Sequence, residues 1–211
     1  MKVAIIGAGN VGKALGGSFA RAGHEVTFTA THPEHAAEAA SAIGARSASS
    51  SAEAVSGADL VILAVPAMSL PDVVSEIADG AKGKVVVDVS NRPTPDPEGA
   101  GTSIAEELQQ QLPNSQVVKA FNTLFATRQA NPLIGGIAAD GYVAGDDPEA
   151  KRIVLEAVES VGLTPVDAGA LAAARTLEGM AWLNISRNMA GGTWQDAFVL
   201  VGPNTTADER N

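Results

Sequence analysis

The chain of 211 residues contains no cysteine, which excludes disulfides, thiolate metal sites, iron–sulfur clusters and thiol chemistry. We therefore expect a cytoplasmic protein. Basic residues are also scarce, because 14 lysines and arginines stand against 24 aspartates and glutamates, for a formal net charge of −10. Nonspecific nucleic-acid affinity needs cations that neutralise phosphates, so no nucleic-acid partner is expected. Any bound anion must be held by local backbone dipoles.

Long apolar runs are missing as well. No run of about 18 apolar residues is present to span a bilayer, so no membrane association is expected. The first apolar stretch, after Lys2, is interrupted by glycines and does not fit an export signal. We therefore expect Met1 to begin a folded domain that is not exported. Apolar residues make up 45% of the chain, enough for one domain with at most a small appendage.

Short apolar runs alternate with helical patterns along the chain. The runs LVILAV (60–65) and KVVVDV (84–89) are typical of strands that are covered on both faces. This alternation predicts an α/β fold, a doubly wound parallel-sheet Rossmann fold with helices on both faces. Strands are expected at 3–6, 25–29, 60–65, 84–89, 117–120, 141–144 and 163–166. Helices are expected at 11–22, 33–43, 71–78, 102–112, 148–161 and 171–189.

The domain boundaries follow from the same pattern. A Rossmann domain is expected at residues 1–168, followed by a small C-terminal helix and turn at 169–202. The polar residues 203–211 are expected to form a flexible tail. The Ala- and Ser-rich residues 45–57 fit a short helix, with a linker as the alternative.

Three glycines carry the strongest local motif. Gly7, Gly9 and Gly12 form G-x-G-x-x-G directly after the first predicted strand and at the start of a helix. In such a βαβ unit the first glycine makes a tight turn and the second lets the backbone approach a pyrophosphate. The third permits close packing of helix and strand, while the helix N-terminus faces the anion. The motif predicts a dinucleotide site, with a purely structural turn as the alternative.

The end of the second predicted strand indicates which dinucleotide is bound. NAD sites usually place an acidic residue there, but this chain has Thr29, Ala30, Thr31 and His32, with Glu34 inside the following turn. Without that negative charge a 2′-phosphate is admitted, and Thr31, His32 and His35 could donate hydrogen bonds to it. We therefore favour NADP(H). The alternative places both histidines at a solvated helix start, and no metal site is expected from them.

Three runs in the second half resemble a known family. They are VVKAFNTL (117–124), GDDPEAKRIV (145–154) and TPVDAGALAAARTLEGMAWLNI (164–185). Together they resemble the coenzyme F420-dependent NADP reductases and the related NADPH-binding domain of the six-transmembrane metalloreductases, from Lys2 to about Leu200. The resemblance implies a Rossmann domain with a small C-terminal helical extension, in which NADPH passes a hydride directly to a deazaflavin (F420) or flavin acceptor.

The resemblance also implies roles for individual residues. The pyrophosphate would be held by Gly7, Ala8, Gly9, Asn10, Val11 and Gly12, and the 2′-phosphate by Thr31, His32 and His35. The cofactor would be bordered by Val65 and Pro66, and the nicotinamide by Phe121, Asn122 and Thr123. The acceptor ring would lie beside the turn that contains Met189, Gly191, Gly192 and Trp194.

Several features keep a structural alternative. Trp182 and Trp194 could both stack on an acceptor ring, with a structural role as the alternative, and Trp182 is expected in the core. Gly191 and Gly192 also fit a simple helix end. Arg175 and Glu178, three residues apart, are expected to form a structural pair. No catalytic acid, base or metal is named, because hydride transfer between stacked rings depends mainly on geometry.

The predicted function is that of an NADP-dependent oxidoreductase with a small-molecule redox acceptor. A non-catalytic NADPH-binding sensor or delivery subunit shares every motif and remains the alternative. Reductases of the 6-phosphogluconate dehydrogenase type carry a long helical second domain, for which the chain is too short. Whether the chain forms a homodimer is left open by the sequence.

Overall fold

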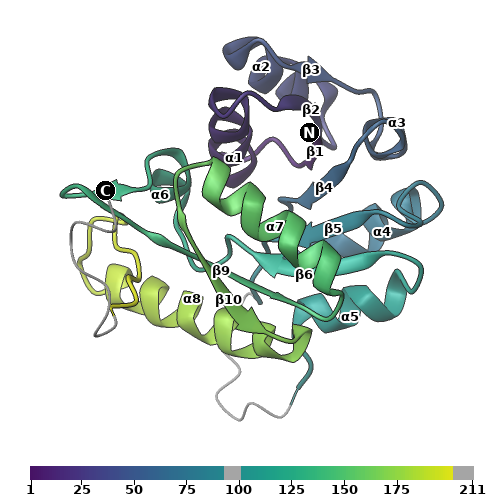
Figure 1. The fold of residues 1–211 in the computed structure, drawn as a ribbon. Helices are drawn as coiled ribbons and strands as arrows, with labels where there is room; N and C mark the ends of the chain where they lie inside the picture. The colour runs from purple at the N-terminus through teal and green to yellow at the C-terminus, as the bar shows by residue number, and fades with distance from the viewer. Residues whose placement is uncertain (93–100, 202–211) are drawn as a thin grey trace.

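One eight-stranded sheet runs through this computed structural model, in which residues 1–92 and 101–201 are described (Figure 1). The strands lie in the order β10-β9-β6-β5-β4-β1-β2-β3. Their bounds are β1 Lys2–Ile6, β2 Glu25–Thr29, β3 Arg46–Ser47, β4 Leu60–Leu63, β5 Val85–Asp88, β6 Gln116–Ala120, β9 Asp140–Gly145 and β10 Thr164–Gly169. The section from β3 to β6 has the strand order of the Rossmann fold. The predicted doubly wound α/β class is confirmed.

Helices cover both faces of the sheet (Figure 1). Side chains of α1, α2 and α7 pack on one face, and those of α3, α4, α5 and the start of α8 pack on the other. The bounds are α1 Asn10–Arg21, α2 Pro33–Ile43, α3 Ser51–Ser56, α4 Leu70–Ile77, α5 Ile104–Gln111, α6 Ala126–Ala130, α7 Pro148–Ser160 and α8 Ala174–Met189. Short 3₁₀ turns, Ala67–Ser69 and Leu171–Ala173, precede α4 and α8. The predicted helices match these elements to within a few residues.

The last two strands, β9 and β10, run antiparallel to the other strands, so the sheet is not fully parallel. Strand β9 pairs antiparallel with β6, and β10 pairs parallel with β9. The connection from β6 to β9 contains only α6 and a short hairpin, β7 Leu133–Ile134 and β8 Ile137–Ala138. Because this connection does not cross back over the sheet, β9 starts where β6 ends and runs in the opposite direction.

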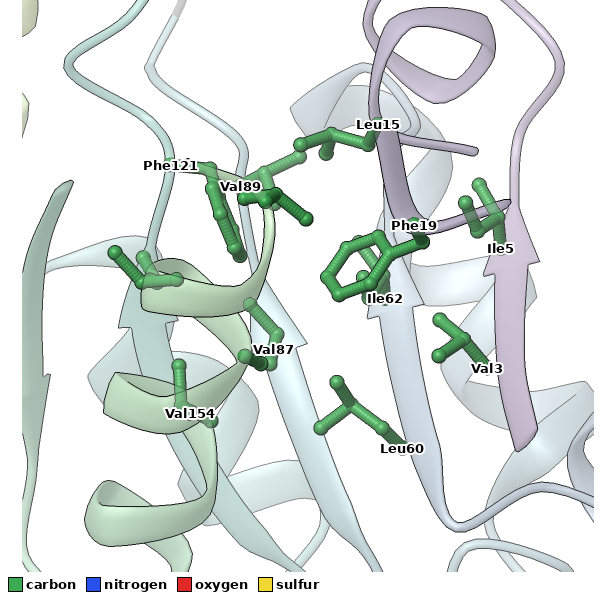
Figure 2. Close-up of a cluster of buried hydrophobic side chains, with 14 of the residues drawn as sticks. Val3, Ile5, Leu15, Phe19, Leu60, Ile62, Val87, Val89, Phe121 and Val154 are labelled. Carbon is green, nitrogen blue, oxygen red and sulfur yellow. The ribbon is translucent and has the colours of Figure 1, made fainter. Parts of the chain in front are cut away.

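A cluster of buried apolar side chains covers the first face of the sheet (Figure 2). Phe19 of α1 and Val154 of α7 are fully buried over Ile5, Ile62 and Val87 of the central strands. Burying a side chain of this size contributes about 1.5–3 kcal/mol. The cluster holds α1 firmly on the strand that precedes the glycine loop.

Three small elements were not expected from the sequence, namely β3, α6 and the β7–β8 hairpin. The hairpin turn is Gly135–Gly136, with φ of 59° and 87°. Glycine pairs favour such turns, so this signal was present. The predicted domain boundary at residue 168 falls inside β10. The predicted tail at 203–211 lies outside the described residues. Within residues 1–92 and 101–201, no helix is long and apolar enough to cross a membrane.

Candidate functional site

The three glycines of the motif at the junction of β1 and α1 have different structural roles. Gly7 adopts a φ of 114°, and a Cβ there would lie 2.3 Å from the Ala64 carbonyl oxygen. A Cβ on Gly12 would lie 1.9 Å from the Gly7 carbonyl oxygen. A Cβ on Gly9 would meet no atom of the described residues within 4 Å. The fold therefore requires glycine at the first and third positions, whereas Gly9 leaves space open beside the loop.

The amino-terminal end of α1 offers unshielded backbone dipoles. Its N-cap residue is Gly9, which has no side chain to cap the helix, and its first turn contains no acidic residue. The helix is 12 residues long and buried along one face. Backbone N–H groups at such an end attract anions such as a pyrophosphate.

A cavity of about 660 Å³ opens at the carboxyl ends of β1, β2 and β4. It brings together these predicted cofactor residues: Gly7, Ala8, Gly9, Thr31, His32, His35, Val65 and Pro66. Sequence reasoning missed two further parts of its wall, the run Ser49–Ser51 before α3 and the carboxylates Asp72 and Glu76 of α4. The serines follow β3, the two-residue edge strand that pairs with β2 and that the sequence did not predict, so their place in the wall could not be inferred.

The wall at the end of β2 contains histidines and no carboxylate between Thr29 and His32. His32 Nδ1 lies 3.7 Å from Glu34 Oε1, and both side chains are 66% exposed. The rings of His32 and His35 meet edge to face, with 5.3 Å between centroids. This wall can therefore donate hydrogen bonds to an anionic group. Among the described residues, no three His, Asp or Glu side chains gather as a metal site would require.

The remaining predicted loop and nicotinamide residues lie outside this cavity lining. Asn10 is exposed at the helix start and Val11 is half-buried. The Phe121 ring is fully buried and meets the Phe19 ring edge to face at 6.0 Å (Figure 2). Its side chain therefore belongs to the core, and only its backbone lies at the edge of the sheet.

Asn122 and Thr123 continue the loop that leaves β6, and both are buried. Asn122 exchanges amide hydrogen bonds with Asn91, which follows β5. The Thr123 carbonyl oxygen accepts a hydrogen bond of 3.3 Å from Asn184 Nδ2 of α8. The loop is thereby tied to the neighbouring strand and to the C-terminal helix.

The predicted acceptor residues lie at the end of α8 and in the turn after it. Met189 is 71% exposed and Trp194 is 44% exposed. Gly191 has a φ of 114°, and a Cβ on Gly192 would lie 2.4 Å from Asn188 Oδ1. These constraints belong to the helix end, so they explain both glycines without a ligand.

The acceptor turn lies beside the loop that leaves β6. The Trp194 ring meets the Phe125 ring edge to face at 5.2 Å. Thr127 Oγ1 donates a 2.6 Å hydrogen bond to the Trp194 carbonyl oxygen. The two segments expected to frame the nicotinamide and the acceptor are therefore neighbours, although they are far apart in the sequence. Trp182 is half-buried in α8.

A buried ion network on the second face of the sheet was not anticipated. Lys119 of β6 is fully buried, and its Nζ lies 2.7 Å from Asp88 Oδ2 and 3.0 Å from Glu178 Oε1. It also donates a 2.6 Å hydrogen bond to the Ser90 carbonyl oxygen. The network joins the ends of β5 and β6 to α8. It lies next to the loops that follow these two strands, which contain Asn91 and Asn122.

The expected pair of Arg175 and Glu178 does not form, because their partners lie on other elements. Glu178 pairs with Lys119, and Arg175 binds Glu106 of α5 through two hydrogen bonds of 2.5 and 2.8 Å. Hydrogen bonds from Arg175, followed by those from Ser103, lower the pKa of Glu106 to about 2. The two helices α5 and α8 are thereby held together.

The Rossmann sheet and the cavity above its glycine loop define the class of nucleotide-binding Rossmann domains. Residues 2–92 match the sequence family described as NADP oxidoreductase, coenzyme F420-dependent, which confirms the resemblance expected from the sequence.

Similar proteins extend the match beyond that region. Metalloreductase STEAP3 of Rattus norvegicus is 33% identical over 84% of this chain, which spans 36% of the length of that protein. The F420-dependent NADP reductase of Methanothermobacter marburgensis is 28% identical over 90% of this chain and 93% of its own. A solved structure from Arthrobacter sp. FB24, provisionally described as an F420-dependent NADP reductase, has a TM-score of 0.85 and 29% identity. It covers 96% of this chain and 100% of that one.

Proposed function

We propose that the chain is an NADP-dependent oxidoreductase that transfers a hydride directly between NADPH and a deazaflavin, coenzyme F420, or a flavin. The observation that carries the proposal is the open space at Gly9, in front of an α1 terminus that the chain leaves without a side-chain cap. The adjoining cavity of about 660 Å³ accommodates an extended nucleotide.

Each part of the chain has a stated task in this proposal. The N–H groups at the start of α1 hold the pyrophosphate, and Thr31, His32 and His35 donate to the 2′-phosphate. Val65 and Pro66 border the cofactor from the end of β4. Bound NADPH supplies two electrons and a proton as hydride from its nicotinamide ring. No side chain is assigned as acid or base.

The choice of F420 as the first acceptor rests on the relatives. The Methanothermobacter protein, which covers nearly the whole chain, is named as an F420-dependent NADP reductase. A flat acceptor would meet the half-exposed ring of Trp194, next to the loop that leaves β6. Stacked rings at about 3–3.5 Å are the arrangement that hydride transfer requires.

The proposal is tested by titration and by absorbance. Calorimetry should show tighter binding of NADPH than of NADH, and His32→Glu should reverse that preference because it places a carboxylate at the end of β2. Oxidation of NADPH is then followed with F420, FMN and FAD in turn. Trp194→Ala should slow the reaction with the best acceptor while NADPH affinity is unchanged. Equal affinity for NADH, or full turnover by Trp194→Ala, would contradict the corresponding assignment.

A second candidate function is delivery of NADPH-derived electrons to a separate partner, or sensing of the nucleotide. It is favoured by the metalloreductase similarity, in which this chain corresponds to about a third of the relative's length. In that case NADPH binds normally but none of the three free acceptors is reduced. The absorbance experiment therefore separates the two functions.

A further inference from the structure

The loop that leaves β6 is held in an unusual backbone conformation. Phe121 has a φ of 61°, which is uncommon for a residue other than glycine. Its carbonyl oxygen accepts hydrogen bonds from Gln129 Nε2 at 3.0 Å and from the Leu124 N–H at 3.3 Å. Strained backbone of this kind persists where the surroundings fix it, and it is frequent at ligand sites. The conformation determines where the next residue, Asn122, directs its side chain.

The orientation of the Asn122 amide is determined by Asn91. Asn91 Nδ2 donates a 3.1 Å hydrogen bond to the Asn122 main-chain carbonyl oxygen. The Asn91 side-chain oxygen is therefore left to accept, and it receives a 2.9 Å hydrogen bond from Asn122 Nδ2. Because the Asn122 amide nitrogen faces Asn91, its Oδ1 is the atom that remains available.

That oxygen is buried without a donor. Asn122 is 5% exposed, and Oδ1 is one of three buried side-chain atoms without a hydrogen-bond partner among the described residues. The other two are Gln129 Oε1 and Trp182 Nε1. A buried acceptor without a partner is costly, and native proteins keep few of them. A ligand that brings a donor to Oδ1 would remove this cost.

The position of Asn122 fits the nicotinamide end of a bound dinucleotide. It follows β6, which is separated from β1 and its glycine loop by β5 and β4 at the same edge of the sheet. Three strand spacings correspond to roughly 14 Å along this edge. A dinucleotide whose pyrophosphate lies at the glycine loop crosses this edge with its nicotinamide half toward β5 and β6.

We propose that Asn122 Oδ1 accepts a hydrogen bond from the carboxamide –NH₂ of the nicotinamide and thereby selects the amide form of the cofactor. The proposal rests on the NADP-binding function proposed above. The loop must open slightly for the carboxamide to reach the buried oxygen. A nicotinic acid ring carries a carboxylate there, which has no donor and is repelled by the Asn122 oxygen.

The test compares the affinities of NADP⁺ and nicotinic acid adenine dinucleotide phosphate, measured by calorimetric titration. Wild-type protein should bind the acid analogue at least about tenfold more weakly, because a site built around a donor rejects a ligand that lacks it. In Asn122→Leu the ratio should fall to near one. In Asn122→Asp the acceptor oxygens remain and a negative charge is added, so the ratio should stay high or increase.

Gln129→Leu is the matched control. This change removes a second buried amide with an unpartnered oxygen, one that braces the same loop through the carbonyl oxygens of Phe121 and Leu124. It should lower the unfolding temperature and leave the ratio unchanged. An equal loss of discrimination in this control would assign the effect to loop rigidity and overturn the proposal.

The wild-type measurement alone can also overturn it. Normal binding of NADP⁺ with equal affinity for the acid analogue would reject the role of Asn122 and leave the proposed function intact. No binding of NADP⁺ at all would reject the proposed function and this assignment with it.

Discussion

The candidate site has one end built from backbone and another built from buried side chains. At β1, the loop Gly7–Gly12 lies against backbone atoms and leaves its helix terminus open. At β5 and β6, the loops are fixed by Lys119, Asp88 and Glu178 beneath them and by the Asn91–Asn122 pair between them. The first end depends on residues close together in the chain, and the second on hydrogen bonds between residues 31 and 59 positions apart.

This difference predicts how substitutions at each end affect ligand binding and folding. Local glycine geometry needs no charged partner, so a side chain added at an open position affects ligand binding and not folding. A buried ion network needs every member, because removal of one leaves a charge without compensation in a dry interior. Four substitutions test this contrast, from the largest expected effect to the smallest.

Lys119→Met should have the largest effect. It leaves Asp88 buried without its cation, and among the described residues Glu178 keeps only Arg92, whose Nε lies 3.9 Å from Glu178 Oε2. We expect a loss of about 3–5 kcal/mol in the free energy of unfolding, measured by urea denaturation. The matched control is Lys84→Met, because among the described residues Lys84 Nζ donates to the Ala58 carbonyl oxygen and to no carboxylate. A similar loss of stability in the control would show that the ion network contributes no more than an ordinary lysine hydrogen bond.

Adding Asp88→Asn and Glu178→Gln to Lys119→Met sharpens this result. The triple variant contains no unpaired charge in the network, so it should be more stable than the single variant. If the triple variant is less stable than Lys119→Met, the carboxylates stabilise the fold by a route other than the ion pairs.

Gly9→Val should reduce NADPH affinity by at least about 100-fold, because the branched side chain would fill the space that we propose for the pyrophosphate. Its cost to folding should not exceed about 1 kcal/mol, the difference between a favourable and an unfavourable N-cap. Gly12→Ala is the contrasting variant, since its Cβ would overlap the Gly7 carbonyl oxygen and should weaken both folding and binding. Calorimetry and thermal unfolding measure both effects. Unchanged NADPH affinity in Gly9→Val would show that the loop is only a structural turn.

Gly192→Ala should destabilise the C-terminal turn by roughly 1–3 kcal/mol. The new Cβ would lie 2.4 Å from Asn188 Oδ1 and 2.7 Å from Asn188 Cα, and the latter is backbone that cannot swing away. In Gly179→Ala of α8 the new Cβ would have no neighbour within 4 Å in the part of the chain that the structure describes, and the change should stabilise the helix slightly. Thermal unfolding that shows the same sign for both variants would contradict the structure of the turn.

Arg175→Gln should have the smallest effect, visible in acid. The pKa of Glu106 is lowered from 4.5 to about 2, so its contribution to stability is complete above about pH 4.5 and is lost as the pH falls toward 2. Without Arg175 the pKa of Glu106 lies closer to 4.5, and the variant should lose less stability over this range. An unchanged acid limb of the stability curve would show that Arg175 does not set this pKa.

The parts that sequence predicted are those encoded by neighbouring residues. The glycine motif, the apolar strands β1, β4 and β5, and helix α2 all follow from local pattern, and they give the fold and one end of the site. The partner of Arg175 is Glu106, 69 residues away, and helix spacing pointed instead to Glu178. Register between strands is likewise not local.

The buried ion pair of Lys119 and Asp88 has a signal in the sequence. Lys119 interrupts the apolar run Val117–Phe121, in a strand expected to be covered on both faces. A lysine in that setting requires a buried counterion. Asp88, near the end of the KVVVDV strand, was available as that counterion. The third member, Glu178, could not be inferred without the packing of α8.

The open terminus of α1 has a consequence for the motion of the chain. Because Gly9 supplies no side-chain acceptor, a bound pyrophosphate would act as the missing N-cap, and ligand affinity would include the energy of ordering the first helical turn. The amide protons of Asn10, Val11 and Gly12 should then exchange with solvent much more slowly once the nucleotide is bound. The bound nucleotide would then complete the amino-terminal end of α1 in place of a side-chain cap.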